Sequence, residues 1–306
     1  MYKFNKILVG LDQTDMDFEL IDAACKMCQM SDSQEVIFMS LLRDFQLPIE
    51  LLQQFPDILD KAIAEREANL RASVERYFTC PDVRIQYVVR QGQPTREIMK
   101  ASEEEKVDLV ILGRKNERKE GGILLSRLAR RAACSLLVIP KGHKMKLDRL
   151  FVPSDFSSYS TLALEKAVEL AHNIPSKPQI AIQNVYQVPS GYHYSGKTYE
   201  EFAELMQQYA KKDYQQVVSG IDFGGLEADV TYTLDREDDV LQYIHAKAME
   251  IQADMLIIGA KGRTSATAIF IGSKAEKLIH LDSKCALLVV RPKGKTAGIR
   301  EYLQEL

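Results

Sequence analysis

Residues 255–278, MLIIGAKGRTSATAIFIGSKAEKL, contain the pattern from which the fold of this chain can be worked out. The apolar run Met255–Ile258 predicts a buried strand, and Gly259 and Gly262 predict a turn after it. Nine residues separate Gly262 from the pair Gly272–Ser273, which predicts the start of a helix. The stretch therefore predicts a strand, a turn, a loop and a helix in succession.

The residue types of this stretch suit the binding of a phosphate group. Glycine lets the backbone approach a ligand closely, and a helix start presents unpaired N–H groups and a partial positive charge. Lys261, Arg263 and Lys274 add cations, and Ser273 adds a hydroxyl group. We therefore predict a phosphate-binding loop at the carboxyl end of a strand. The spacing matches neither a Walker A loop nor G-x-G-x-x-G, and a glycine-rich turn without a ligand is the alternative explanation.

The chain repeats one pattern twice, and this repeat decides the fold. Lys6–Asp12, KILVGLD, opens the first half and Arg149–Asp155, RLFVPSD, opens the second; each is an apolar strand that ends at an aspartate. The other expected strands are Glu35–Leu41, Val83–Val89, Leu109–Leu112 and Ser135–Ile139, then Gln179–Tyr186, Ala228–Leu234, Met255–Ile258 and Ala286–Val290. The expected helical segments are Asp15–Met30, Pro48–Phe78, Thr95–Glu105, Ser158–Asn173, Tyr199–Val218, Asp238–Ile251 and a short tail helix, Arg300–Glu305.

Strands that alternate with helices predict a parallel sheet with helices on both faces. Near-continuous apolar strands fit a sheet that is buried on both sides. We expect an α/β protein with two tandem, five-stranded, Rossmann-like domains at residues 1–141 and 147–294, with a charged linker between them and a tail at 295–306. In such sheets ligands bind at the carboxyl ends of the strands, where the strand order reverses. The residues expected at such ends are Asp12, Asp155, Gly113 and Gly259.

Composition bounds the class of protein. The 306 residues are 46% hydrophobic and 27% charged with a net charge of −3, which gives no basic field for nucleic acid or an anionic membrane. No apolar run reaches the roughly 20 residues of a membrane-spanning helix, and the first residues lack a signal-peptide pattern. The five scattered cysteines suggest reduced thiols, so we expect a cytoplasmic protein.

The spacing of the glycine-rich loop closely resembles the nucleotide loop of the universal stress protein family, and the resemblance covers both halves, about Lys3–Pro140 and Leu147–Pro292. It implies the strand order 3-2-1-4-5 in each domain and an ATP-type nucleotide, with or without Mg²⁺, in the second. It also implies a role for each matching residue. These residues are Pro153, Asp155 and Val185 near the adenine, Ile258 and Gly259 against the ribose, and Gly262, Gly272, Ser273 and Lys274 around the phosphates, with Arg263 as a further cation.

The first half departs from this pattern. Aligning Cys134 with Cys285 makes Gly122 the partner of Gly272 to within one residue, and 9 positions then separate Gly113 from Gly122, against 13 from Gly259 to Gly272. We therefore predict that the first site is degenerate. The changes are Asn116 for a glycine, Ile123 for the serine, and the added acids Glu117 and Glu120; a competing alignment, which makes the helix too short, puts Ser126 opposite Gly272.

Three other features have a simpler explanation beside a functional one. The C-x-x-C of Cys25 and Cys28 lies inside a predicted helix without a second pair, which favours packed thiols over a metal or redox site. The acidic run Asp235–Asp239 suits a helix start better than a divalent cation. The aromatic segment Tyr186–Tyr199 either covers a ligand near Val185 or packs the following helix.

The expected role is that of a stress-response sensor or regulator, with the nucleotide as a conformational ligand. A slow ATPase or nucleotidyl transferase is the alternative, but no general base is recognisable beside the loop. A third possibility is an interaction module that binds no nucleotide. Because apolar edge strands invite association, Ser135–Ile139 and Ala286–Val290 are expected to pair as an intrachain pseudo-dimer, and a homodimer of chains stays open.

Overall fold

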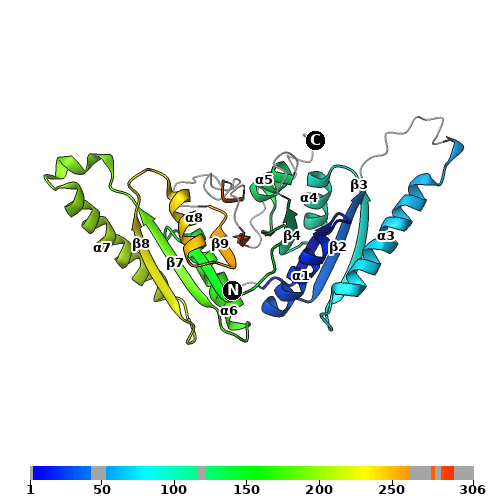
Figure 1. The fold of residues 1–306 in the computed structure, drawn as a ribbon, viewed down its shortest axis with the longest axis horizontal. Coiled ribbons are helices and arrows are strands. Elements are labelled where there is room, and N and C mark those ends of the chain that lie inside the picture. The colour runs from blue at the N-terminus through cyan, green and yellow to red at the C-terminus, as the bar shows by residue number, and fades with distance from the viewer. Residues whose placement is uncertain (1–2, 43–52, 116–120, 262–276, 280–283, 293–306) are drawn as a thin grey trace. The chain divides into compact units, whose positions relative to one another are not determined.

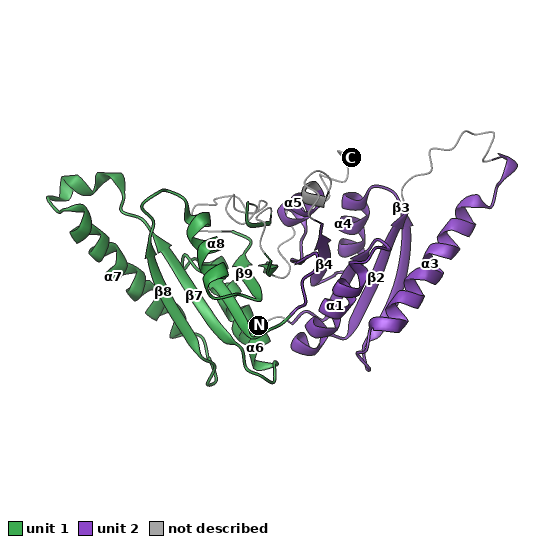
Figure 2. Cartoon of the chain, in the orientation of Figure 1, with its two compact units in different colours: residues 1, 146–292 green, residues 2–145, 293–306 purple. Residues whose placement is uncertain are grey.

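The computed structural model describes residues 3–42, 53–115, 121–261, 277–279 and 284–292. The chain divides into two compact units, shown in two colours in Figure 2. We call residues 2–145 with 293–306 the N-terminal unit, and residues 146–292 with Met1 the C-terminal unit. The predicted tail helix lies outside the described residues.

The N-terminal unit is a parallel sheet flanked by helices (Figure 1). Its strands are β1 (Lys6–Leu11), β2 (Glu35–Leu42), β3 (Arg84–Gln91), β4 (Leu109–Arg114) and β5 (Ser135–Pro140), in the spatial order β3-β2-β1-β4-β5. Its helices include α1 (Asp17–Ser31), α3 (Ile58–Tyr77), α4 (Pro94–Glu104) and α5 (Gly121–Arg131). Helix α1 packs with α3, and α4 packs with α5.

The C-terminal unit repeats this arrangement. Its strands are β6 (Arg149–Pro153), β7 (Gln179–Tyr186), β8 (Ala228–Leu234), β9 (Met255–Gly259) and β10 (Ala286–Val290), all parallel, in the order β8-β7-β6-β9-β10. Its helices include α6 (Ser158–His172), the 3₁₀ helix η1 (Ser190–Ser195), α7 (Tyr199–Val218) and α8 (Val240–Glu250). Both units therefore have the strand order 3-2-1-4-5, which confirms the predicted fold.

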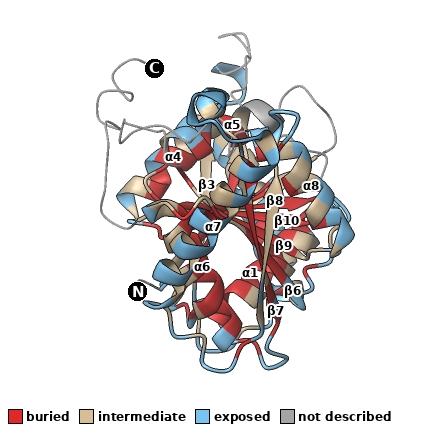
Figure 3. Ribbon diagram, turned by 90° about the vertical axis from the view of Figure 1, so that its left-hand side faces the viewer, coloured by how far each residue is buried: buried red, intermediate tan, exposed pale blue. Residues whose placement is uncertain are grey.

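Burial of the strands explains why the sequence folds in this way. Every residue of β5 and of β10 is buried, and the same holds for most of β1, β4 and β9. Figure 3 shows these buried strands between helices whose outer faces are exposed. A parallel sheet covered on both faces needs apolar side chains in both directions, so its strands read as continuous apolar runs.

An aspartate before the fourth strand ties it to the start of the first strand in each unit. The Asp108 carboxylate accepts a hydrogen bond from the Lys6 N–H at 3.1 Å. The Asp254 carboxylate accepts two, from the N–H groups of Asp148 and Arg149, both at 2.9 Å. These carboxylates satisfy backbone donors that would otherwise lack partners at the amino end of the sheet.

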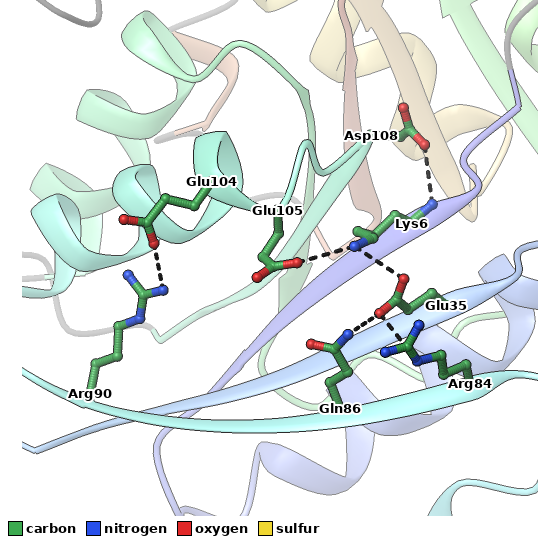
Figure 4. A network of polar contacts seen from close by, with 8 residues as sticks. All are labelled: Lys6, Glu35, Arg84, Gln86, Arg90, Glu104, Glu105 and Asp108. Atoms are coloured by element: carbon green, nitrogen blue, oxygen red, sulfur yellow. Dashed lines mark hydrogen bonds and ion pairs between the residues drawn. The ribbon is translucent and has the colours of Figure 1, made fainter.

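Charged side chains extend this contact in the N-terminal unit (Figure 4). The Lys6 ammonium lies 3.0 Å from Glu35 and 3.1 Å from Glu105, and Gln86 also donates to Glu35. Burial lowers the pKa of Lys6, but the two carboxylates outweigh this effect and raise it overall. This network lies at the edge of the sheet opposite to the carboxyl ends of the strands, so it has a structural role.

The linker between the units is held against α1. Lys141 forms an ion pair with Asp15 at 2.9 Å, and the Gly142 N–H donates to the Glu19 carboxylate at 2.9 Å. Lys26 donates to the carbonyl of Met145 at 2.6 Å, and the Met145 side chain is buried. The charged linker thus packs as part of the N-terminal unit. The predicted pairing of the two last strands concerns both units at once and stays a prediction.

We expect Asp254→Ala to destabilise the chain by about 1–3 kcal/mol, because two backbone N–H groups lose a charged acceptor. The measurement is urea unfolding followed by far-ultraviolet circular dichroism. Glu204→Ala is the control, since Glu204 is exposed on α7, and its effect should stay within about 0.5 kcal/mol. Equal unfolding midpoints for the two variants would contradict the assigned role.

Candidate functional site

The C-terminal unit brings the first group of predicted site residues to one edge of its sheet. Strands β7, β6 and β9 are neighbours, and the strand order reverses between β6 and β9. Pro153 is the last residue of β6, and Asp155 follows it by two positions. Val185 lies at the end of β7, and Ile258 and Gly259 end β9. The register pairs Phe151 with Leu256, so these strand ends lie side by side at the switch point.

A tight turn between β6 and α6 positions Asp155. The Ser157 N–H donates to the Asp155 carboxylate at 3.0 Å, and the Phe156 N–H donates to the Ser154 hydroxyl at 3.1 Å. Phe156 has φ of +57°, a left-handed conformation that a phenylalanine rarely adopts. Ser157 then caps α6 by accepting from the Ser160 N–H. Asp155 is half-buried and its orientation is set by its own turn.

A side chain of the second strand fixes the end of the first strand in both units. In the C-terminal unit the Asn184 amide donates to the Ser154 carbonyl at 2.8 Å. In the N-terminal unit the Ser40 hydroxyl donates to the Leu11 carbonyl at 2.9 Å. Each carbonyl belongs to the residue just before the aspartate of the repeat. The bond therefore holds Asp155 beside Val185, and Asp12 beside the end of β2.

Gly259 lies directly under the first turn of α6. A Cβ atom at this position would come within 2.4 Å of the Tyr159 carbonyl oxygen. At the matching position of the first repeat, a Cβ on Gly113 would meet the Met16 side chain at 2.6 Å. Helix packing alone therefore requires a small residue at Gly259, and this glycine is no independent sign of a ligand.

Lys261 is the last described residue before the glycine-rich loop. It is buried, and its ammonium lies 5.7 Å from the centre of the Tyr159 ring, within the range of a cation–π contact. The repeat matches Lys261 with Lys115, whose ammonium forms an ion pair with Asp12. The remaining predicted site residues, Gly262, Arg263, Gly272, Ser273 and Lys274, lie outside the described residues.

The same edge of the N-terminal unit carries charged side chains from other segments. Arg66 of α3 donates from Nε to the Ser40 hydroxyl at 3.0 Å and from its terminal nitrogen to the Asp12 carbonyl at 3.4 Å. The buried Asp17 carboxylate accepts from the N–H groups of Asp12 and Gln13. Burial raises the pKa of Asp17, and these hydrogen bonds oppose the rise. The carboxyl ends of β1 and β2 in the N-terminal unit therefore have polar partners from the protein itself.

The register of the sheet gives the difference in length between the β4–β5 connection and the β9–β10 connection. Leu109 of β4 pairs with Ser135 of β5, 26 positions later. Met255 of β9 pairs with Ala286 of β10, 31 positions later. Ser135 and Ala286 therefore hold matching places, as the alignment of Cys134 with Cys285 requires. The connection in the C-terminal unit is longer by five residues, which leaves more chain for a loop around a ligand.

The alternative sites have structural explanations. Tyr192 packs against Tyr199 at 5.6 Å and Phe202 at 6.3 Å between ring centres, so at least this part of the aromatic segment packs α7. Asp239 caps α8, and the buried Asp235 accepts from backbone N–H groups of its own loop. Among the described residues, no three His, Cys, Asp or Glu side chains lie close enough to hold a metal ion.

A cavity of about 430 Å³ lies between α6 and α7, outside the predicted site. Two of its lining residues, Glu165 and Asp213, are acidic, which disfavours a phosphate group there. Its lining residues are Phe156, Thr161, Glu165, Asp213, Gln216, Val217, Gly220 and Ile221. Within the described part of the chain, no helix has the length and apolar composition needed to cross a membrane.

Sequence reasoning found the strand-end residues but missed those that hold them. Asn184, Tyr159 and Arg66 each contact a site position in their unit. The repeat carried a signal for two of them: superposing the two halves matches Asn184 with Ser40 and Tyr159 with Met16. Arg66 gave no signal, because it comes from a helix more than 50 residues beyond Asp12.

Comparisons with known proteins agree with this geometry. The sequence profile of the universal stress protein family matches residues 3–140 and 146–291. The chain therefore belongs to the universal stress protein family and carries two copies of its domain. The universal stress protein E homolog of Haemophilus influenzae is 23% identical over 96% of this chain and 99% of its own length.

Two further relatives show single and tandem forms. A universal stress protein of Synechocystis is 26% identical over 44% of this chain and 97% of its own length. The crystal structure of a universal stress protein from Archaeoglobus fulgidus superposes with a TM-score of 0.63 and 18% identity, and it covers 95% of this chain and 99% of that one. At this identity the superposition supports the fold alone.

The two glycines at the ends of β4 and β9 allow a matched test. We expect Gly259→Ala to destabilise the chain by about 2–3 kcal/mol, because the new Cβ meets backbone that cannot move aside. Gly113→Ala should cost less, since the flexible Met16 side chain can yield. Thermal and urea unfolding of both variants measure the difference. A larger loss for Gly113→Ala would show that the contact with Tyr159 is not the limiting one.

Proposed function

We propose that this universal stress protein binds one ATP-type nucleotide, with or without Mg²⁺, in its C-terminal unit, and that the bound nucleotide regulates a stress response. The carrying observation is the convergence of Pro153, Asp155, Val185, Ile258 and Gly259 at the switch point of one sheet. Parallel α/β sheets bind ligands at this place. The loop that follows has the residue types of a phosphate cradle.

Each residue has a role in this proposal that follows from its position. Asp155 and the backbone of Val185 contact the adenine, because they lie at the ends of two adjacent strands, β6 and β7. Ile258 and Gly259 lie against the ribose on the far side of β6. The phosphates reach the loop after Lys261, where Gly262, Gly272, Ser273 and Lys274 supply N–H groups, a hydroxyl and a cation, and Arg263 adds charge.

Three differences support a site in the C-terminal unit only. The connection after β4 is five residues shorter than the one after β9. Arg66 takes the hydrogen-bond positions at Ser40 and the Asp12 carbonyl, whereas α7 places no arginine at the matching position. The acids Glu117 and Glu120 in the first loop disfavour a phosphate.

The nucleotide acts in this proposal as a conformational ligand and not as a substrate. Asp155 is held by its own turn at the adenine end, far along the ligand from any phosphate, so it is poorly placed to activate a water. A slow ATPase or nucleotidyl transferase on the same fold is the alternative. It differs from the first proposal in requiring a general base beside the γ-phosphate.

Titration calorimetry with ATP tests the binding site. We expect one nucleotide per wild-type chain, and Asp155→Ala should weaken binding by roughly 10- to 100-fold, because a charged hydrogen-bond partner contributes about 1.5–3 kcal/mol. Asp12→Ala is the matched control and should leave the affinity unchanged. Unfolding temperatures of both variants are measured first, so that a loss of binding is not a loss of fold.

A second pair of variants addresses the loops. Gly272→Val should abolish binding by blocking the close approach of the backbone to the phosphates, and Gly122→Val should leave it unchanged. Two nucleotides per chain, or loss of binding in the Gly122 variant, would refute the assignment to the C-terminal unit. No binding at all would favour the interaction module.

Incubation with γ-labelled ATP tests for turnover. We expect no sustained turnover, because the sequence shows no recognisable general base beside the glycine-rich loop. Many turnovers per minute, abolished by a single carboxylate substitution that leaves binding intact, would establish the enzyme alternative instead. The Asp155→Ala variant is not suitable for this comparison, because it also weakens binding.

A further inference from the structure

Three of the five cysteines gather at one place in the N-terminal unit. Cys25 and Cys28 lie one turn apart on α1, and both are buried. Cys80 lies on the connection between α3 and β3 and is partly exposed. The sequence pattern shows only the first two, because Cys80 is 52 positions beyond Cys28.

Cys80 meets Cys25 rather than Cys28. The Cys80 thiol donates to the Cys25 carbonyl at 3.4 Å, and the Thr79 N–H donates to the Cys25 sulfur at 3.3 Å. Both contacts join the connection between α3 and β3 to Cys25. Two consecutive residues of the connection between α3 and β3, Thr79 and Cys80, therefore contact Cys25 of α1.

These contacts place Cys25 and Cys80 next to each other, which a disulfide between them requires. A disulfide needs two sulfur atoms in contact and a backbone that can adjust by a fraction of an ångström, and a connection between two elements allows this. A metal site is the competing reading of clustered thiols. It needs at least three ligands arranged around one point, and no three described His, Cys, Asp or Glu side chains are arranged in this way.

We propose that Cys25 and Cys80 are a peroxide-oxidisable pair, and that their intramolecular disulfide fastens the α3–β3 connection to α1. Disulfides in reducing compartments are usually transient and redox-sensing, and a pair formed by one buried and one partly exposed thiol fits that use. The proposal does not depend on nucleotide binding, because the pair lies in the other unit.

The chemistry proceeds in two balanced steps. The Cys80 thiolate attacks hydrogen peroxide, the O–O bond breaks, and the products are a sulfenic acid on Cys80 and one water. The Cys25 sulfur then attacks the Cys80 sulfur, the S–S bond forms, the S–O bond breaks, and the second water leaves. Two thiols lose two electrons in total, and one peroxide becomes two waters.

Burial makes this pair slow to react. It raises the pKa of Cys80, the residue that attacks the peroxide, to about 12. The thiolate is the reactive form, so little of it is present near neutral pH. The pair therefore resists mild oxidants and responds to sustained peroxide, unlike a cysteine whose pKa is lowered for catalysis.

The experiment is a peptide map of the full chain after treatment with hydrogen peroxide. Remaining thiols are blocked with N-ethylmaleimide under denaturing conditions before digestion without a reductant. We expect two of the five thiols to be lost, a mass decrease of about 2 Da for the S–S bond, and a linked peptide that joins Cys25 to Cys80. Dithiothreitol should restore all five thiols.

Variants separate this pair from the alternatives. Cys28→Ser should keep the linked peptide, because Cys28 is not a member of the pair, and Cys80→Ser should lose it. A peptide that joins Cys25 to Cys28, a disulfide between two chains, or overoxidation of Cys80 without any link would overturn the proposal. The wild-type map alone distinguishes these outcomes, so the conclusion stands even if a variant folds poorly.

Discussion

Each unit depends on one close approach, between the start of its first helix and the last glycine of its fourth strand. Tyr159 of α6 lies against Gly259, and Met16 lies against Gly113 just before α1. The contact brings the helix start down onto the edge where the strand order reverses. The position of the helix start also fixes the position of the turn before it, which contains the aspartate of the repeat. The paired parallel strands fix the sheet, and the close approach of the helix start to this glycine fixes where the helix begins at the carboxyl edge of the sheet.

The two copies share that frame and differ in what they place around it. Both fix the end of the first strand by a side chain of the second, Ser40 in one and Asn184 in the other. The N-terminal unit adds Arg66 and Asp17 to the same edge. Polar groups at a strand end contribute little to the apolar core, so one copy can change its edge without losing its fold.

Much of this could be predicted from the sequence, because it rests on short-range rules. Strands β7, β8 and β10 and helix α7 begin and end at the predicted residues. Strand β10 is a fully buried apolar run, and Thr198 caps α7 with Glu201 in a capping box. Strand β6 ends at Pro153 rather than at Asp155, because the aspartate belongs to the turn. Contacts such as Cys25 with Cys80, or Arg66 with Asp12, join segments more than 50 residues apart, and no spacing rule reaches that far.

The anchored linker bears on how the chain can be divided. A fragment that stopped at Pro140, where β5 ends, would lack the buried Met145 side chain. It would also lack the Met145 carbonyl, which accepts a hydrogen bond from Lys26. It would also leave the Glu19 carboxylate without the Gly142 N–H. The smallest piece that keeps these contacts of the first half therefore runs through Met145, and a truncation drawn from strand boundaries alone would remove hydrogen-bond partners of two α1 side chains.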